Sequence, residues 1–290
     1  MIKAIAMDMD GTLLNEKEQL PPLTKEKLTE LERQGVKLIL ASGRSYTRLM
    51  PYAKQLEMAK HGGWLLEVDG VAIYDLANME RHKERTLSPE EIAEVYAYLM
   101  GQYCEVQACF DDGLFAYYPP EVIPAKEAFR KENELPEDYP WTAGPWNWCH
   151  DLRGGYPKQT FVKSPAEIDR PVNKLQIMTD ADKLQPLFDK LVEKFGDRFE
   201  VFRTTPRQLE VLPKGFSKGE GLKRIMEIEN WKPEEIMVFG DGENDVSMFE
   251  VTPNSYAMGN AAVYVQEKAN HVIGSNRAEG IFHALEKEGL

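Results

Sequence analysis

Two aspartates at the end of the first apolar segment carry side chains suited to catalysis. Asp8 and Asp10 follow the apolar run from Ile2 to Met7, and Gly11 comes directly after them. A carboxylate such as that of Asp8 can attack phosphorus and split a slow hydrolysis into two faster steps. A second carboxyl group, that of Asp10, can protonate the leaving alcohol and later accept a proton from water. Taken alone, the Asp-x-Asp-Gly pattern is also compatible with a calcium loop or a turn, although Thr12 does not continue an EF-hand ligand series.

Two further apolar segments also end in polar loops that contain glycine. The run from Val36 to Ala41 leads into Ser42, and the run from Ile236 to Phe239 leads through Gly240 into Asp241. Short apolar runs bounded by turn residues are typical of buried strands in a parallel sheet. Because such sheets bind ligands at the carboxyl ends of their strands, we expect these loops to converge with Asp8 and Asp10.

The order of the segments predicts an α/β fold, a Rossmann-like parallel sheet with helices on both faces. Strands and helices alternate up to a third strand at about Trp64 to Val68, and the same rhythm resumes at Ser217. Between these parts, helices are punctuated by hairpins. We therefore expect a catalytic core made of residues 1–85 and 213–290, with an α+β cap domain inserted at 86–212.

The inserted segment has local signals of its own. Ser88 and Glu91 form a capping box that predicts a helix to about Met100, and residues 111–113 predict a turn between two strands. The irregular stretch 134–157 contains three of the five tryptophans of the chain: Trp141, Trp146 and Trp148. Aromatic faces can stack on sugars or bases, but bulky aromatic side chains most often fill cores, and both interpretations stay open here.

The composition argues against several classes of protein. A net charge of −13 disfavours a binder of nucleic acid or of anionic membranes, because such surfaces need basic patches. The three cysteines form no CxxC pair and the five histidines show no zinc-ligand spacing, so we expect reduced thiols and no zinc site. Asp8 comes too early for a signal peptide, and no apolar run reaches membrane-spanning length. We expect a soluble, cytoplasmic protein.

Four segments, in the same order along the chain, resemble the motifs of the haloacid dehalogenase superfamily. They are Asp8 to Leu14, Ala41 to Arg44, Ser217 to Gly219, and Gly240 to Asp245. The Ser-Gly-Arg sequence, the large insertion after it and the Gly-Asp-Gly-x-Asn-Asp sequence are similar to those of the Cof-like hydrolases. The resemblance spans essentially the whole chain, and it implies a cap domain that closes over the catalytic site.

The resemblance implies that Asp8 is the nucleophile and Asp10 the general acid and base. It also implies that Mg²⁺ is held by Asp8, by the backbone carbonyl of Asp10 and by Asp241. Magnesium prefers a few carboxylates together with water and substrate phosphate, which agrees with this small set of ligands. A divalent metal would also supply positive charge that an acidic phosphate-binding protein needs.

Further motif residues are assigned to the phosphoryl group. The resemblance implies that Ser42, Gly43 and Asn244 bind it and that Lys218 stabilises the negative charge that develops on it. A helix that begins near Lys218 adds the favourable dipole of its N-terminus. Lys214 competes for the cationic role, but it lies outside the Ser-Lys-Gly motif. Asp245 either orients Lys218 or the waters of the metal, or is an ordinary acidic residue at a helix start.

The implied activity is magnesium-dependent hydrolysis of small phosphorylated metabolites, such as sugar phosphates, through an aspartyl-phosphate. A phosphotransferase or phosphomutase is the alternative among enzymes, and a non-catalytic sensor of a phosphorylated metabolite is the alternative outside them. Asp69 stands where many Cof-like proteins have asparagine, which either alters substrate preference or caps a turn. The sequence predicts neither the leaving group nor the oligomeric state.

Overall fold

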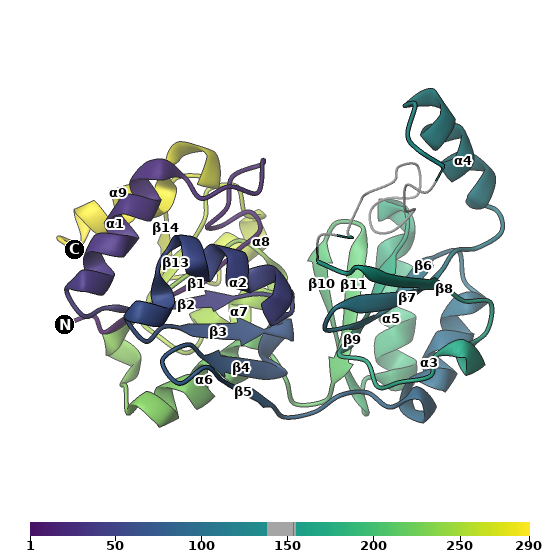
Figure 1. Cartoon of the computed structure of the whole chain (residues 1–290), viewed down its shortest axis with the longest axis horizontal. Coiled ribbons are helices and arrows are strands. Elements are labelled where there is room, and N and C mark those ends of the chain that lie inside the picture. Colours follow the sequence, from purple (N-terminus) through teal and green to yellow (C-terminus); the bar gives the residue numbers. More distant parts are fainter. Residues whose placement is uncertain (138–152, 154) are drawn as a thin grey trace. The chain divides into compact units, whose positions relative to one another are not determined.

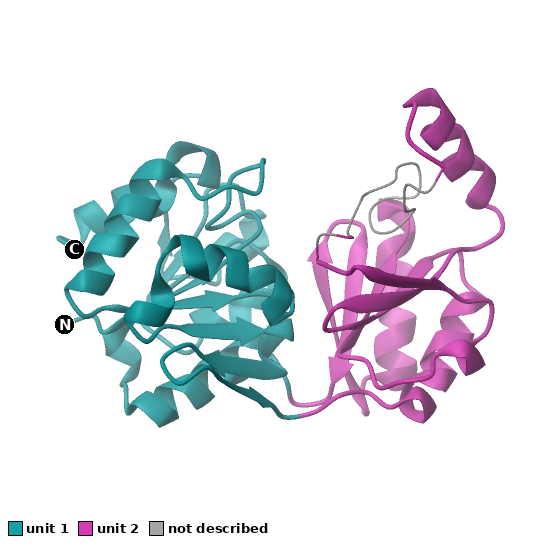
Figure 2. Ribbon diagram, in the orientation of Figure 1, with its two compact units in different colours: residues 1–84, 216–290 teal, residues 85–215 magenta. Residues whose placement is uncertain are grey.

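The computed structural model describes residues 1–137, 153 and 155–290 (Figure 1). The chain forms two compact units, one made of residues 1–84 and 216–290 and the other of residues 85–215 (Figure 2). Trp141, Trp146 and Trp148 lie outside the described residues, so the prediction for their stretch stays a prediction.

Unit 1 is built on an eight-stranded sheet with the order β14-β13-β12-β1-β2-β3-β4-β5. Its strands are β1 (Ala4–Asp8), β2 (Lys37–Ala41), β3 (Trp64–Glu67), β4 (Ala72–Asp75), β5 (Glu80–Lys83), β12 (Ile236–Gly240), β13 (Asn254–Ala257) and β14 (His271–Val272). Neighbouring strands from β14 to β3 are parallel, whereas β4 and β5 pair antiparallel at the other end. The predicted parallel sheet is confirmed.

Helices cover both faces of this sheet, because its central strands are apolar on both sides. Ile5 and Met7 of β1 belong to one buried cluster, while Ala4 and Ala6 belong to another, as the alternation of side chains along a strand requires. The first cluster includes residues of α1 (Pro22–Arg33), α2 (Tyr46–Gln55) and α9 (Gly280–Lys287). The second includes residues of α6 (Lys218–Glu229), α7 (Val246–Phe249) and α8 (Val263–Gln266).

Unit 2 is an α+β layer with a six-stranded sheet in the order β10-β11-β9-β6-β7-β8. Its strands are β6 (Glu105–Phe110), β7 (Gly113–Tyr117), β8 (Lys158–Phe161), β9 (Lys174–Met178), β10 (Phe199–Thr205) and β11 (Gln208–Pro213). Its helices are α3 (Pro89–Met100), α4 (Ile123–Glu132) and α5 (Ala181–Phe195). The capping box is confirmed: the Ser88 hydroxyl accepts from the Glu91 N–H, and the Glu91 carboxylate accepts from the Ser88 N–H.

The two faces of the sheet in unit 2 differ in chemistry. Val106 and Leu175 share an apolar cluster with residues of α3 and α5. Strand alternation places polar side chains on the opposite face, among them Gln107, Gln176 and Glu210. Within the described residues of both units, no helix combines the length and the apolar character needed to cross a bilayer.

Candidate active site

Three loops of unit 1 meet at one edge of the parallel sheet. Asp8 is the last residue of β1, Ser42 follows the last residue of β2, and Asp241 follows the last residue of β12. Since β1 pairs in parallel with both β2 and β12, the carboxyl ends of all three strands lie at the same edge. The convergence expected from the sequence is therefore present in the structure.

Lys218 links two of the carboxylates at this edge. Its Nζ donates to Asp8 Oδ1 at 2.5 Å and to Asp245 Oδ1 at 2.6 Å, and the residue is only 1% exposed. Helix α6 begins at Lys218 because the Ser217 hydroxyl caps it by accepting from the Glu220 N–H. Gly219 allows a close approach to the neighbouring α7, since a Cβ there would lie 2.2 Å from the Ser247 carbonyl oxygen. The start of α6 is thus fixed against the acidic loop.

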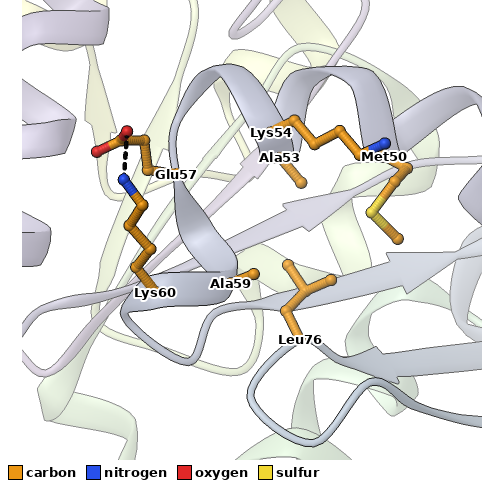
Figure 3. Close-up of a pocket in the computed structure, with 7 residues that line it drawn as sticks. All are labelled: Met50, Ala53, Lys54, Glu57, Ala59, Lys60 and Leu76. Atoms are coloured by element: carbon orange, nitrogen blue, oxygen red, sulfur yellow. Dashed lines mark hydrogen bonds and ion pairs between the residues drawn. The ribbon is translucent and has the colours of Figure 1, made fainter.

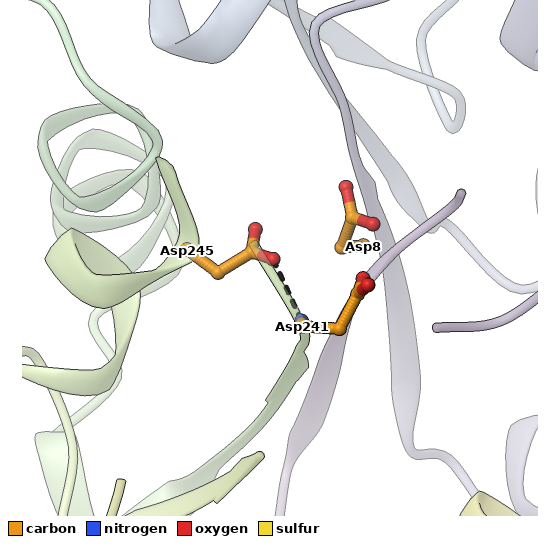
Figure 4. A group of neighbouring side chains, drawn as sticks. All are labelled: Asp8, Asp241 and Asp245. Carbon is orange, nitrogen blue, oxygen red and sulfur yellow. Dashed lines mark hydrogen bonds between the residues drawn. The ribbon is translucent and has the colours of Figure 1, made fainter. Parts of the chain in front are cut away.

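Asp8, Asp241 and Asp245 form a compact acidic cluster (Figure 4). One carboxylate oxygen from each lies within 4.8 Å of those of the others. Asp245 Oδ2 accepts from the backbone N–H groups of Asp241 and Gly242, both at 2.9 Å. Thr12 donates to Asp241 Oδ1 at 2.8 Å, so each carboxylate of the cluster is held by at least one donor.

The cluster has more negative than positive charge. Burial, and next the charge of Asp245, raise the pKa of Asp8 well above its ordinary value, although Lys218 opposes the shift. The same two causes raise the pKa of Asp241 to about 7. Burial lowers the pKa of Lys218, but Asp245 and Asp8 raise it more, so the side chain stays charged.

The residues at this edge fit a bound magnesium ion. Three carboxylates stand against one ammonium group, and a divalent cation would remove the repulsion that raises the two aspartate pKa values. The available ligand atoms are all carboxylate oxygens, which magnesium prefers over nitrogen and sulfur. The geometry and the charge of the cluster therefore agree with a metal of that class.

Asp10 lies beside this cluster and forms an ion pair with Arg44. Arg44 Nε donates to Asp10 Oδ2 at 2.8 Å, and Arg44 Nη2 donates to Asp10 Oδ1. The same Nη2 donates to Glu18 Oε1 at 2.8 Å. The Asp10 side chain is 57% exposed, whereas that of Arg44 is only 8% exposed.

The remaining candidate residues surround the end of β2. The Ser42 hydroxyl accepts from the Arg44 N–H at 3.2 Å, and its backbone carbonyl accepts from the Asp69 N–H at 3.0 Å. Asn244 Nδ2 donates to the carboxylate of Asp69 at 2.9 Å, and Asp69 is fully buried. Gly43 is partly exposed between Ser42 and Arg44.

The backbone of residues 68–70 is strained where it meets these groups. Val68 and Asp69 have φ values of +48° and +50°, a region that β-branched and other non-glycine residues rarely adopt. The Val68 N–H donates to the Arg44 carbonyl oxygen at 3.1 Å, which holds the loop in this conformation. Such strain often accompanies functional sites.

Lys214, the competing lysine, belongs to unit 2. Its Nζ donates to the Gly196 carbonyl oxygen at 2.8 Å and lies 3.4 Å from Glu200. Unlike Lys218, which bonds Asp8 and Asp245, Lys214 pairs with residues of unit 2.

A depression of about 210 Å³ elsewhere in unit 1 is lined by none of the candidate residues (Figure 3). Its walls come from α2, from the 3₁₀ turn after it and from the segment after β4. They are formed by Met50, Ala53, Lys54, Glu57, Ala59, Lys60 and Leu76. The lining is mostly apolar, and the Glu57–Lys60 ion pair at 2.6 Å stands at its rim.

The structure adds residues that sequence reasoning had not assigned a role. Arg44 belongs to the Ser-Gly-Arg motif, so its position next to Ser42 was a signal that could have identified it. Thr12 likewise belongs to the first motif, two residues after Asp10. Glu18 and Asn260 offered no such signal: Asn260 reaches the Gly11 carbonyl oxygen, at 2.8 Å, from 249 residues further along the chain.

Several known proteins are similar to this chain over nearly its whole length. A family model described as haloacid dehalogenase-like hydrolase matches residues 5–285. The pyridoxal phosphate phosphatase YbhA of Escherichia coli (strain K12) is 27% identical over 288 residues, covering 96% of both chains. The 5-amino-6-(5-phospho-D-ribitylamino)uracil phosphatase YbjI of the same organism is 25% identical, covering 99% of this chain and 96% of that protein. A crystal structure of a haloacid dehalogenase-like hydrolase from Bacteroides thetaiotaomicron superposes with a TM-score of 0.75 at 27% identity, covering 99% of this chain and 100% of the other.

Proposed function

Because this chain belongs to the haloacid dehalogenase-like hydrolases and is a phosphatase, we propose that it hydrolyses small phosphate monoesters through a phosphorylated Asp8, with magnesium. The observation that best supports the proposal is the contact of the buried Lys218 with both Asp8 and Asp245, beside Asp241. A cation, a nucleophile and a set of metal ligands then lie at one edge of the sheet.

In the first half-reaction, an oxygen of the Asp8 carboxylate attacks phosphorus. The bond from phosphorus to the leaving-group oxygen breaks, and that oxygen takes the proton of the Asp10 carboxyl group. In the second half-reaction, a water oxygen attacks the phosphorus of the aspartyl-phosphate while Asp10 accepts a proton from that water. The bond from Asp8 to phosphorus breaks, which releases inorganic phosphate and restores both carboxyl groups.

Other residues hold the phosphoryl group and balance its charge. We assign the Ser42 hydroxyl, the Gly43 N–H and the Asn244 amide as donors to its oxygens, and Lys218 as the cation that stabilises the charge developing there. Lys218 also fixes Asp8 Oδ1 at 2.5 Å, so the nucleophile is oriented before substrate arrives.

Asp8, Asp241 and the Asp10 carbonyl oxygen would hold magnesium, and Asp245 would orient Lys218. When bound, the ion supplies positive charge that offsets the carboxylates and polarises the phosphoryl oxygens. Burial and the charge of Asp245 raise the pKa of Asp241 to about 7, and a bound divalent cation would offset both causes.

We propose small phosphorylated metabolites as substrates, including sugar phosphates and phosphorylated cofactors. Two relatives that cover nearly the whole chain are named as phosphatases of pyridoxal phosphate and of a phosphoribitylamino-uracil. We further propose that unit 2 is the cap domain that selects the leaving group. One face of its sheet supports this role, because it carries polar side chains in place of a second apolar layer, among them the partly exposed Gln176.

The replacement Asp8→Asn tests the proposal. The amide is a poor nucleophile of nearly the same shape, so phosphate release from a panel of phosphometabolites with Mg²⁺ should fall by at least about 10⁴-fold while the melting temperature is kept. Asp197→Asn, at an exposed position of unit 2, serves as the matched control and should keep full activity. Near-normal rates in the Asp8 variant would contradict the assignment of the nucleophile.

Two other outcomes with the unaltered protein would also contradict the proposal. Phosphoryl transfer to added sugars in place of phosphate release would indicate a phosphotransferase or phosphomutase. Binding of phosphometabolites without any turnover in the presence of Mg²⁺ would indicate a sensor.

A further inference from the structure

Within the part of the chain that the structure describes, Arg44 is the residue that holds the side chain of Asp10, the proposed acid and base. Its side chain is 57% exposed, and an exposed aspartate ordinarily samples several rotamers. Here both of its oxygens accept from the guanidinium of Arg44, one of them from Nε at 2.8 Å. A two-point contact of this kind fixes both the position and the plane of the carboxylate.

Arg44 is itself held firmly. Its side chain is only 8% exposed, Nη2 also donates to Glu18 Oε1 at 2.8 Å, and the guanidinium carbon lies 6.0 Å from the centre of the Tyr52 ring. Its backbone N–H donates to the Ser42 hydroxyl, and its carbonyl oxygen accepts from the Val68 N–H. Arg44 is therefore a rigid support at the end of β2.

Glu18 in turn lies in an ordered turn, residues 15–19. The Glu18 N–H donates to the Asn15 carbonyl oxygen at 3.0 Å, and the Glu18 carbonyl oxygen accepts from the Tyr52 hydroxyl at 3.1 Å. The Asn15 side chain accepts from the N–H groups of Lys17 and Gln19 at 2.9 and 3.0 Å. These contacts fix the backbone of Glu18, whose carboxylate accepts from the same Arg44 Nη2 that donates to Asp10.

We propose that Arg44, held by Glu18, is the positioning residue that orients Asp10 towards the leaving-group oxygen. A carboxyl group has about four lone-pair sites, so the pairing with Arg44 leaves room for the proton that Asp10 exchanges. This inference rests on the proposed function, in which Asp10 gives that proton. Arg44 acts through Asp10, so its loss matters most where the leaving group needs the proton.

Two substrates with different leaving groups test the inference. Glycerol 2-phosphate releases an alkoxide that must be protonated, whereas p-nitrophenyl phosphate releases an anion that is stable without a proton. Arg44→Lys keeps the charge but loses the two-point contact, so kcat/KM for glycerol 2-phosphate, which reports only the steps up to release of the alcohol, should fall by about 10²-fold. For p-nitrophenyl phosphate we expect kcat/KM to fall by less than about 3-fold, because hydrolysis of the aspartyl-phosphate, in which Asp10 acts as base for both substrates, does not enter kcat/KM.

Two further variants complete the experiment. Glu18→Gln loses the charge that holds Arg44 and should lower the ratio of kcat/KM for glycerol 2-phosphate to kcat/KM for p-nitrophenyl phosphate by about 10-fold. Because Glu18 lies on a surface turn, this variant keeps the test valid if the Arg44 variant fails to fold. Arg33→Lys is the matched control: Arg33 is an exposed residue in the last turn of α1 and should leave the ratio unchanged.

Equal losses of kcat/KM for both substrates in the Arg44 and Glu18 variants would overturn the inference, because a general structural defect does not distinguish leaving groups. A KM raised for both substrates at constant kcat would also overturn it, since that is the signature of a phosphate-binding arginine. Failure of the proposed function is distinguishable from both results, because the unaltered protein would then release no phosphate from either substrate.

Discussion

The buried carboxyl group of Glu32 makes the stability of unit 1 depend on pH. Glu32 lies on α1, is 2% exposed, and neither of its carboxyl oxygens has a hydrogen-bond partner among the described residues. Burial, and next the charge of Glu57, raise its pKa from 4.5 to about 8. At neutral pH the folded protein therefore holds a proton on Glu32 that the unfolded chain has lost.

The sign and the size of the effect follow from this difference. Where the folded state binds more protons, the free energy of unfolding falls as the pH rises, by up to about 1.4 kcal/mol per pH unit. The loss of stability begins above pH 4.5, the pKa of Glu32 in the unfolded chain, and ends near pH 8, its pKa in the folded protein, which is about 8. The full difference corresponds to an upper limit of about 5 kcal/mol, and allowance for residual solvation reduces it to roughly 2 kcal/mol.

The replacement Glu32→Gln removes this titration and keeps the shape of the side chain. We expect the unaltered protein to lose stability progressively from about pH 5 to pH 8, and the variant to lose about 2 kcal/mol less over the same range. Equilibrium urea unfolding at several pH values, followed by circular dichroism, measures both free energies.

Two other variants identify the cause. Glu26→Gln changes an exposed residue of the same helix and should leave the pH dependence as it is. Glu57→Gln removes the charge that adds to the pKa of Glu32, so the fall in stability should end at a lower pH. Parallel curves of unfolding free energy against pH for Glu32→Gln and the unaltered protein would refute the reasoning.

Two predictions concern the charges of the active site. Asp241→Asn should raise the Mg²⁺ concentration for half-maximal activity by at least about 10-fold, as measured by metal titration of the chelated protein; an unchanged requirement would contradict its role as a ligand. Asp69→Asn removes a buried carboxylate that accepts from Asn244 and whose negative charge acts on Lys218. Without that charge, inorganic phosphate should inhibit the enzyme about 3- to 10-fold more strongly. An unchanged inhibition constant would contradict the prediction that the charge of Asp69 weakens phosphate binding.

The central strands could be predicted because burial on both faces leaves a plain signal in the sequence. β1, β2 and β12 are short apolar runs, and each ends where a polar loop begins. β4 and β5 were missed. The sequence of β5, Glu-Arg-His-Lys, carries no apolar alternation, because this strand lies at the edge of the sheet, where charged residues are common.

Some contacts of the candidate site could likewise be predicted from the sequence, and others could not. Parallel topology alone brings Asp8 and Asp241 to one edge, so their proximity followed from the order of the strands. The pairing of Arg44 with Asp10 and Glu18 depends on a five-residue turn and on side-chain rotamers, which no periodicity encodes. The left-handed backbone at Val68 is equally unpredictable, because β-branched residues avoid that conformation and long-range contacts impose it here.

The order of strands in unit 1 also affects how the chain is made. The strand β1 lies between β2, which follows soon after it, and β12, which is synthesised far later. Asp8 and Lys218 are 210 residues apart, so at usual rates of translation about 10 to 40 s separate them. Unit 2 is continuous, and all of its strands are synthesised within that interval. Until β12 is made, one edge of β1 has no neighbouring strand and its backbone groups are exposed. Asp8 likewise has no ion-pair partner in Lys218 until most of the chain has been synthesised.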